Sequence, residues 1–97
     1  MKSTTECLYL LKEYMKKNAQ KYGISRIGIF GSVARGEQQE NSDVDICLMT
    51  NKPNLFTLVH IKEDLQQLFN SNVDIVRIHD NMDSLLKQRI MKEGIYV

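Results

Sequence analysis

Apolar residues recur at the three- to four-residue spacing of an α-helix in three separate segments of the chain. Ser3 and Glu6 form the pattern of a capping box at the start of the first segment, and a glycine follows the first and the third. These patterns predict helices from Ser3 to Gly23, from about Leu55 to Phe69, and from a cap at Asn81 or Asp83 to Gly94. On the middle helix, the stripe predicted to be buried consists of Leu55, Leu58, Val59, Leu65, Leu68 and Phe69.

Three shorter segments show the alternation and the β-branched residues typical of strands, namely residues 24–30, 43–49 and 73–78. In the middle segment, Val44 and Ile46 share one face while Asp43 and Asp45 point to the other. A short helix is predicted over residues 32–39, after the first strand. The predicted order of elements is therefore αβαβαβα.

Composition narrows the class of protein. The 97 residues are 42% hydrophobic, and 13 Lys and Arg against 12 Asp and Glu give a net charge of +1. This length predicts one domain over residues 1–97, and the near-zero charge argues against direct binding to nucleic acid. No apolar stretch approaches the ~20 residues that span a bilayer, and nothing resembles a signal peptide, so we expect a cytoplasmic protein without membrane contact. Cys7 and Cys47 lie far apart and are expected to be small buried apolar side chains.

Three aspartates occupy strand positions, where aspartate is uncommon. Asp43 and Asp45 lie two residues apart and hence on one face, and Asp74 lies inside another apolar strand. If these strands are neighbours, the carboxylates converge, and two like charges ~4 Å apart cost on the order of 4 kcal/mol at an effective dielectric of 20. Such a cluster needs a counterion, and carboxylate oxygens select Mg²⁺ or Mn²⁺. The alternative is that these aspartates line a solvated sheet face or cap turns.

Gly31 and Ser32 lie between the first strand and the predicted short helix, where free backbone N–H groups favour an anion. Glycine allows a phosphate to approach the backbone closely, and the Ser32 hydroxyl adds a donor. Arg35, about one turn further on, either holds a phosphate oxygen or pairs at the surface with Glu37 or Glu40. By itself, Gly-Ser is also common as a purely structural strand-to-helix turn.

Together, the Gly-Ser motif and the aspartates indicate a protein family more specifically than either does alone. Gly31-Ser32 is followed after ten residues by Asp43-x-Asp45, with the sequence ARGE between them. This pattern resembles the signature of the DNA polymerase β nucleotidyltransferase superfamily, and FGSVARGEQQENSDVDI resembles the minimal nucleotidyltransferase (MNT) family. The resemblance covers nearly the whole chain, including the VDIV strand with its third carboxylate.

The resemblance implies an α+β fold in which helices flank a small mixed β-sheet. In the superfamily, two metal ions, Mg²⁺ or Mn²⁺, hold the nucleotide and the departing pyrophosphate, and the third carboxylate, here Asp74, assists removal of the acceptor proton. The implied site residues are Gly31, Ser32 and Arg35 for the substrate ATP, and Asp43, Asp45 and Asp74 for catalysis and metal binding.

Members of the MNT family typically pair with a HEPN-domain toxin, and some transfer AMP from ATP to a tyrosine of that toxin. The resemblance therefore implies an antitoxin that neutralises a HEPN toxin by transferring AMP to one of its hydroxyl groups and forms a hetero-oligomer with it. Two alternatives stay open: neutralisation by complex formation alone, or nucleotidyl transfer to a small molecule or an RNA end. The near-neutral charge argues against an RNA acceptor.

Overall fold

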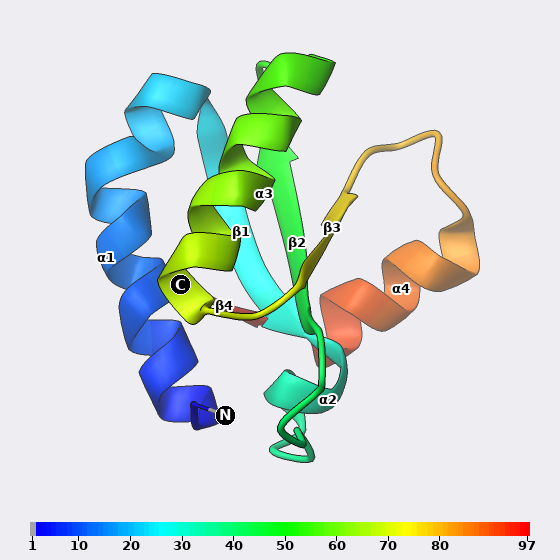
Figure 1. Cartoon of the computed structure of the whole chain (residues 1–97). Coiled ribbons are helices and arrows are strands. Elements are labelled where there is room, and N and C mark those ends of the chain that lie inside the picture. Colours follow the sequence, from blue (N-terminus) through cyan, green and yellow to red (C-terminus); the bar gives the residue numbers. More distant parts are fainter. Residues whose placement is uncertain (1) are drawn as a thin grey trace.

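Helices and strands alternate along the chain in the computed structural model, which describes residues 2–97 (Figure 1). The helices are α1 (Thr4–Tyr22), α2 (Gly31–Ala34), α3 (Leu55–Phe69) and α4 (Ser84–Glu93). The strands are β1 (Ile24–Phe30), β2 (Val44–Thr50), β3 (Val73–Arg77) and β4 (Ile95–Tyr96). The predicted order is confirmed through α4, after which β4 is an addition. Within residues 2–97, no helix has the length and apolar character needed to cross a membrane.

Side-chain caps define the starts of α1 and α4. The Ser3 hydroxyl accepts a hydrogen bond from the backbone N–H of Glu6 (3.1 Å), and the Glu6 carboxylate accepts one from the backbone N–H of Ser3 (3.4 Å), which completes the predicted capping box. At α4 the cap is Asp83 and not Asn81, because the Asp83 carboxylate accepts a bond from a first-turn N–H (3.0 Å). The predicted starts of both helices therefore have a local physical cause.

The strands form one mixed sheet of four strands in the order β3-β2-β1-β4. β1 is antiparallel to both β2 and β4, whereas β2 and β3 run parallel. The chain between β2 and β3 forms α3, which supplies the crossover that parallel neighbours require. This arrangement confirms the predicted α+β fold with a small mixed sheet, and it leaves β3 and β4 as the edge strands.

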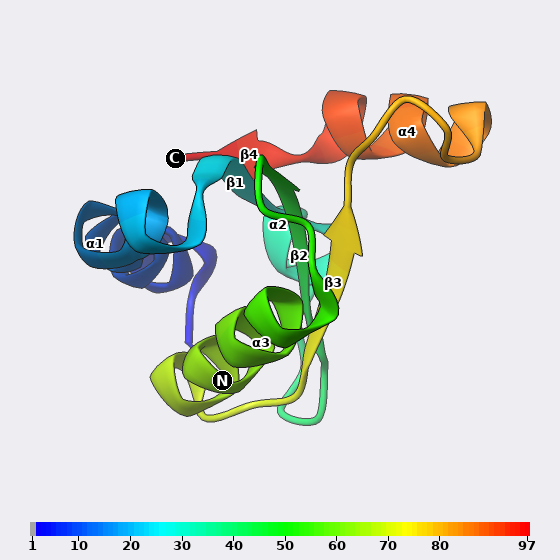
Figure 2. The same ribbon diagram turned by 90° about the horizontal axis from the view of Figure 1, so that it is seen from above.

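Helices cover both faces of the sheet: α1 and α3 lie on one face, and α4 lies on the other (Figure 2). Full burial of one aliphatic side chain contributes roughly 1.5–3 kcal/mol, so the larger cluster under α1 and α3 dominates stability. Its fully buried members include Leu11, Ile27, Ile29, Val33, Val44, Ile46, Leu48, Ile61, Leu65 and Val73. The smaller cluster under α4 contains Cys47, Ile78 and Ile90. Both cysteines are buried, as predicted, and both are free thiols.

Two elements differ from the prediction. The predicted helix over residues 32–39 is only the four residues of α2, because Gly36 adopts a left-handed conformation with φ of 70° that a helix cannot continue. The added strand β4 is two residues long and pairs with Gly28 and Ile29 of β1. A segment of two residues is too short to show an alternating pattern, so only its pairing with β1 identifies it as a strand.

The stripe predicted to be buried on α3 is partly wrong. Leu65 and Phe69 are buried, and Ile61, which the prediction omitted, is fully buried. Leu55 and Val59 are 71% and 43% exposed. The face that meets the sheet is therefore rotated about the helix axis relative to the predicted stripe, so that the first two turns present apolar side chains beside the edge strand β3.

Two tyrosine hydroxyls of α1 join this helix to α3. Tyr14 Oη donates to Asp64 Oδ2 (2.9 Å), and Tyr22 Oη donates to the same oxygen (3.2 Å). We expect Tyr14→Phe to lower the free energy of unfolding by about 1–2 kcal/mol, because hydrogen bonds to a carboxylate are stronger than neutral ones. Urea unfolding measures the change, with Tyr9→Phe, at a position that is 64% exposed, as the control. Equal stability of the two variants would show that the Tyr14–Asp64 bond contributes nothing net.

Candidate active site

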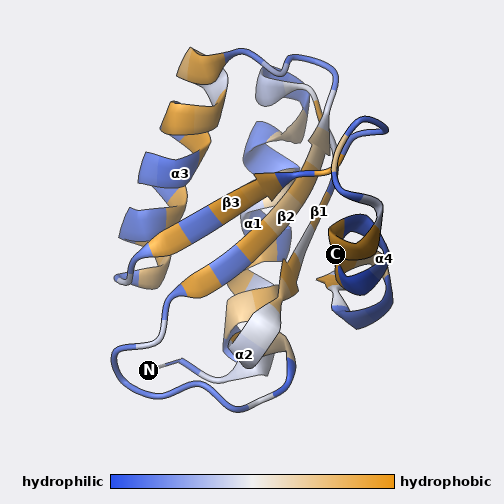
Figure 3. Cartoon of the chain, turned by 90° about the vertical axis from the view of Figure 1, so that its right-hand side faces the viewer, coloured by the Kyte–Doolittle hydropathy of each residue, from blue (hydrophilic) through white to orange (hydrophobic). Residues whose placement is uncertain are grey.

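Parallel pairing of β2 and β3 places two of the predicted carboxylates side by side. Asp45 of β2 is the direct register partner of Asp74 of β3. Neighbouring strands lie about 4.8 Å apart, so both side chains leave the sheet at the same level. Asp43 precedes Asp45 by two residues and therefore points to the same face, opposite the buried face of Val44. Figure 3 shows β2 and β3 as hydrophobic strands interrupted by hydrophilic bands.

The charges of Asp43 and Asp74 act on the carboxylate of Asp45. Its side chain is partly buried, and burial is the main cause that raises the pKa of this carboxyl group above its ordinary value. The negative charges of Asp74 and then Asp43 raise this pKa further, and Arg35 lowers it. The site therefore has excess negative charge around Asp45, a charge that a bound cation would balance.

Gly31 brings the Gly-Ser motif onto the carboxylates. The last residue of β1, Phe30, pairs with Asp45, so the turn after β1 begins beside that side chain. Gly31 has φ of 72°, and a Cβ at this position would overlap the Asp45 carboxylate oxygen Oδ2. Both the backbone conformation and the close approach require glycine. Two motifs that lie ten residues apart in the sequence are therefore in contact.

The start of α2 leaves its first backbone N–H groups without a side-chain cap, because the residue at the cap position is Phe30. α2 is only four residues long, so the helix dipole on which the sequence argument partly relied is small. Donors for an anion at this turn are therefore the backbone N–H groups of Gly31 and Ser32 and the Ser32 hydroxyl. Binding of a triphosphate by these two residues stays a prediction.

Arg35 forms the surface ion pair that was one of its two predicted roles. Arg35 Nε contacts Glu37 Oε2 at 2.9 Å, and both side chains are about half exposed or more. This hydrogen bond is the main cause of a raised pKa of the arginine, and Asp45 contributes weakly. Contact of Arg35 with a phosphate oxygen stays a prediction, and it would require the side chain to leave Glu37.

The donor chemistry of the site fits a hard divalent cation, because the charges of Asp74 and Asp43 act on the Asp45 carboxylate and leave negative charge in excess there. Within residues 2–97, however, no three His, Cys, Asp or Glu side chains are gathered so that they could hold a metal ion by themselves. The charges of Asp43 and Asp74 therefore act on Asp45, but the three carboxylates do not form a complete metal site by themselves. Oxygens of a bound nucleotide would complete such a site, as is usual for Mg²⁺.

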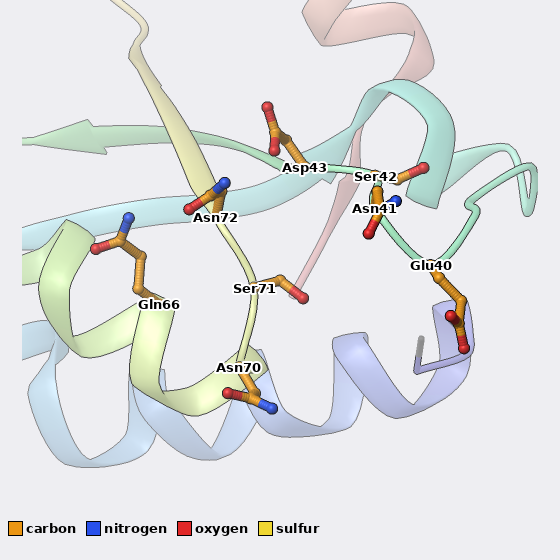
Figure 4. A pocket seen from close by; sticks show the side chains of 8 residues that line it. All are labelled: Glu40, Asn41, Ser42, Asp43, Gln66, Asn70, Ser71 and Asn72. Atoms are coloured by element: carbon orange, nitrogen blue, oxygen red, sulfur yellow. The ribbon is translucent and has the colours of Figure 1, made fainter.

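A polar depression of about 460 Å³ lies next to the carboxylates, between the segment before β2 and the turn before β3 (Figure 4). Amides and hydroxyls dominate its lining, which consists of Glu40, Asn41, Ser42, Asp43, Gln66, Asn70, Ser71 and Asn72. Apart from Asp43, none of these residues was predicted from the sequence to belong to the site. The one available signal was the density of Asn and Ser before both strands. In the fold, the backbone N–H of Val44 donates to the carbonyl of Asn72 (2.9 Å) and joins the two segments that line the depression.

Comparison with protein families identifies the family of this chain. A family model described as polymerase beta, nucleotidyltransferase, matches residues 11–97. The chain belongs to this family. The match includes both the Gly-Ser motif and the carboxylates, and it confirms the resemblance seen in the sequence.

Relatives of this nucleotidyltransferase match it over most of their length. Protein adenylyltransferase MntA of Thermococcus cleftensis is 33% identical over 89 residues, which are 91% of this chain and 89% of the relative. A Methanocaldococcus jannaschii protein, provisionally named a protein adenylyltransferase, is 33% identical over 98 residues and is covered completely, as is this chain.

Solved structures share the fold of the nucleotidyltransferase. A structure provisionally named a minimal nucleotidyltransferase has a TM-score of 0.79 at 29% identity and covers 97% of this chain and 95% of its own. A toxin–antitoxin structure with AMP-PNP has a TM-score of 0.74 at 22% identity, with 91% of this chain and 69% of its own covered. The chain is thus a minimal nucleotidyltransferase in fold and in family.

Proposed function

We propose that this minimal nucleotidyltransferase transfers AMP from ATP to a hydroxyl group, with tyrosine as the expected acceptor, of a partner HEPN-domain toxin and thereby neutralises it. The observation that carries the proposal is the contact of Gly31 with Asp45, next to Asp74, in a chain of this family. Relatives that match nearly the whole chain are named protein adenylyltransferases. Solved structures of the same fold include toxin–antitoxin complexes, one of them with AMP-PNP.

Each residue of the proposed site has its own role in the reaction. The N–H groups of Gly31 and Ser32 and the Ser32 hydroxyl bind the triphosphate and orient its α-phosphorus. The acceptor oxygen attacks that phosphorus, the bond from the α-phosphorus to the bridging oxygen breaks, and pyrophosphate leaves. Asp74, the exposed carboxylate beside Asp45, accepts the proton of the acceptor hydroxyl.

Asp43 and Asp45 would hold divalent cations, two Mg²⁺ ions or Mn²⁺, which neutralise phosphate charge and polarise the α-phosphorus. The raised pKa of Asp45 supports this role, because a carboxylate among like charges is stabilised by a cation. Asp45 is partly buried while Asp43 is exposed, so Asp45 is the more rigidly placed of the pair.

The open form of the site supports a macromolecular acceptor. Asp43 and Asp74 are exposed, and the helices cover the sheet without covering this end of β2 and β3 (Figure 1). A site that residues 2–97 leave open cannot exclude water from a bound nucleotide by itself, so a docked protein surface would complete it.

The test is label transfer from α-labelled ATP, with Mg²⁺, to a HEPN-domain protein encoded beside this chain. We expect the partner to become labelled on a tyrosine. We expect the Asp43→Asn variant to transfer label at least about 100-fold more slowly than the parent, because it removes one charge that acts on the transition state. Label on no protein, or unchanged transfer by Asp43→Asn, would contradict the proposal. Neutralisation that survives Asp43→Asn would instead favour complex formation without catalysis.

A further inference from the structure

A second depression, which we call the α3–β3 groove, lies between α3 and the edge strand β3, the strand that carries Asp74. Its volume is about 390 Å³. Leu55, Leu58, Val59 and Lys62 line it from α3, and Asp74 and Arg77 line it from β3. The α3 residues follow the spacing of one helical face, so they form a continuous apolar stripe that ends at a lysine.

This groove is the apolar surface that the sequence pattern predicted to be buried. Leu55 and Val59 stay exposed because β3 is an edge strand, and no further strand within residues 2–97 covers the first turns of α3. The outer side of β3 also has backbone groups without a partner strand, a position where an extended segment of another chain can add. An apolar stripe beside a free strand edge therefore has the features of a peptide-docking surface.

The charges at the groove specify the chemistry of its occupant. Ion pairs among residues 2–97 involve only Lys16, Arg35 and Lys87 as the basic partners. Lys62 and Arg77 therefore have no carboxylate partner among the described residues, and they flank the apolar stripe. An occupant with acidic side chains next to apolar ones would pair with both features.

We propose that the α3–β3 groove binds the acceptor segment of the protein substrate, an extended segment in which apolar and acidic residues adjoin the modified hydroxyl. The inference rests on the AMP transfer proposed above, and it identifies the surface that brings the acceptor to Asp74. Side chains of a strand added at the free edge of β3 would alternate between the two faces of the sheet, so that some pack into the groove and the next reach the face of the Asp74 carboxylate, which receives the proton. The exposed apolar residues Leu85 and Leu86 of α4 line a different depression, whose lining does not include Asp74.

The test compares two variants that differ only in surface. Leu55 and Leu85 are 71% and 72% exposed, and each lies in the first turn of a helix, where aspartate is favourable. We expect Leu55→Asp to raise the KM for the HEPN-domain protein about tenfold at unchanged kcat, as loss of one central apolar contact does, and Leu85→Asp to leave both unchanged. Biolayer interferometry with the same protein is expected to show the same difference in affinity.

Charge reversal supplies an independent variant. Lys62→Glu is expected to raise the KM for the acceptor about fivefold at low salt and less at high salt, whereas Lys92→Glu on α4 has no effect. Equal KM values for Leu55→Asp and the parent, or a loss of affinity caused by Leu85→Asp instead, would overturn the groove assignment. So would a wild-type dimer that Leu55→Asp converts to a monomer without changing transfer.

The groove assignment and the proposed AMP transfer can each be wrong independently, and the measurements distinguish the two cases. If no variant transfers label while Leu55→Asp alone weakens binding in interferometry, the groove binds the partner and the proposed activity is wrong. If transfer occurs and the KM for the acceptor does not change with Leu55→Asp, the activity stands and the groove assignment is wrong.

Discussion

Replacing Asp45 with asparagine is expected to reduce AMP transfer by about 100- to 1,000-fold while making the fold more stable at neutral pH. Asp45 faces Asp74 across the parallel strands, so it is the carboxylate closest to the centre of the proposed site. Asparagine keeps the shape and removes the charge. Initial rates of label transfer from ATP measure the first effect, and thermal unfolding at pH 7 measures the second.

The gain in stability has a defined dependence on pH. Burial, with the charges of Asp74 and Asp43, raises the pKa of Asp45 in the folded state. Folding therefore favours the protonated carboxyl, and this contribution is fully present below the unfolded pKa and is lost as the pH rises through the folded pKa. The Tm advantage of Asp45→Asn over the parent should accordingly be largest at neutral pH and vanish in acid.

Asp83→Asn is the matched control for this variant. It removes one carboxylate charge at the cap of α4, where asparagine caps as well as aspartate. We expect neither transfer nor stability to change appreciably. A drop in Tm at pH 7 for Asp45→Asn, or transfer within a factor of two of the parent, would show that Asp45 is a structural residue and not part of a charged site.

Gly31→Ala is expected to abolish transfer and to lower stability by more than about 1–2 kcal/mol, the cost of a left-handed conformation for a residue with a Cβ. The additional loss arises because the new Cβ would overlap the Asp45 carboxylate. Either the turn after β1 or the Asp45 side chain must then move. Urea unfolding and label transfer, measured on the same preparation, give both effects.

The chain contains a control that separates conformation from contact. Gly36 has φ of 70°, close to the 72° of Gly31, but a Cβ at Gly36 would meet no atom within 4 Å. Gly36→Ala should therefore lose only the conformational part of the stability and should retain transfer. If Gly31→Ala and Gly36→Ala lose the same stability and both retain transfer, the contact between Gly31 and Asp45 has no functional role.

The variants of Asp45 and Gly31 change the same proposed site, which forms where three segments of the chain meet. The end of β1 brings Gly31, β2 brings Asp45, and β3 brings Asp74. Because β1 is antiparallel to β2 while β3 is parallel to it, the end of β1 lies beside the starts of the other two strands. The mixed character of the sheet is thus the reason that a glycine turn and two carboxylates adjoin.

Several elements could be predicted because their causes are local. The capping box of Ser3 and Glu6 depends on residues three apart, and the alternation in β2 places Asp43 and Asp45 on one face whatever surrounds them. Other elements depend on distant parts of the chain. β4 is a strand only because β1 pairs with it, and the exposure of Leu55 follows from the place of β3 at the edge of the sheet.

The sequence alone determined the type of nearly every element, the family, and the residues from which a nucleotidyltransferase site would be made, because each depends on short spacings. Only the tertiary structure decided which of these residues meet. It placed Asp45 opposite Asp74 through strand pairing, brought Gly31 against Asp45, and directed Arg35 to Glu37. It also left the first turns of α3 uncovered. Spacing along a chain defines the face of an element, whereas the neighbour of that face depends on the packing of the whole sheet.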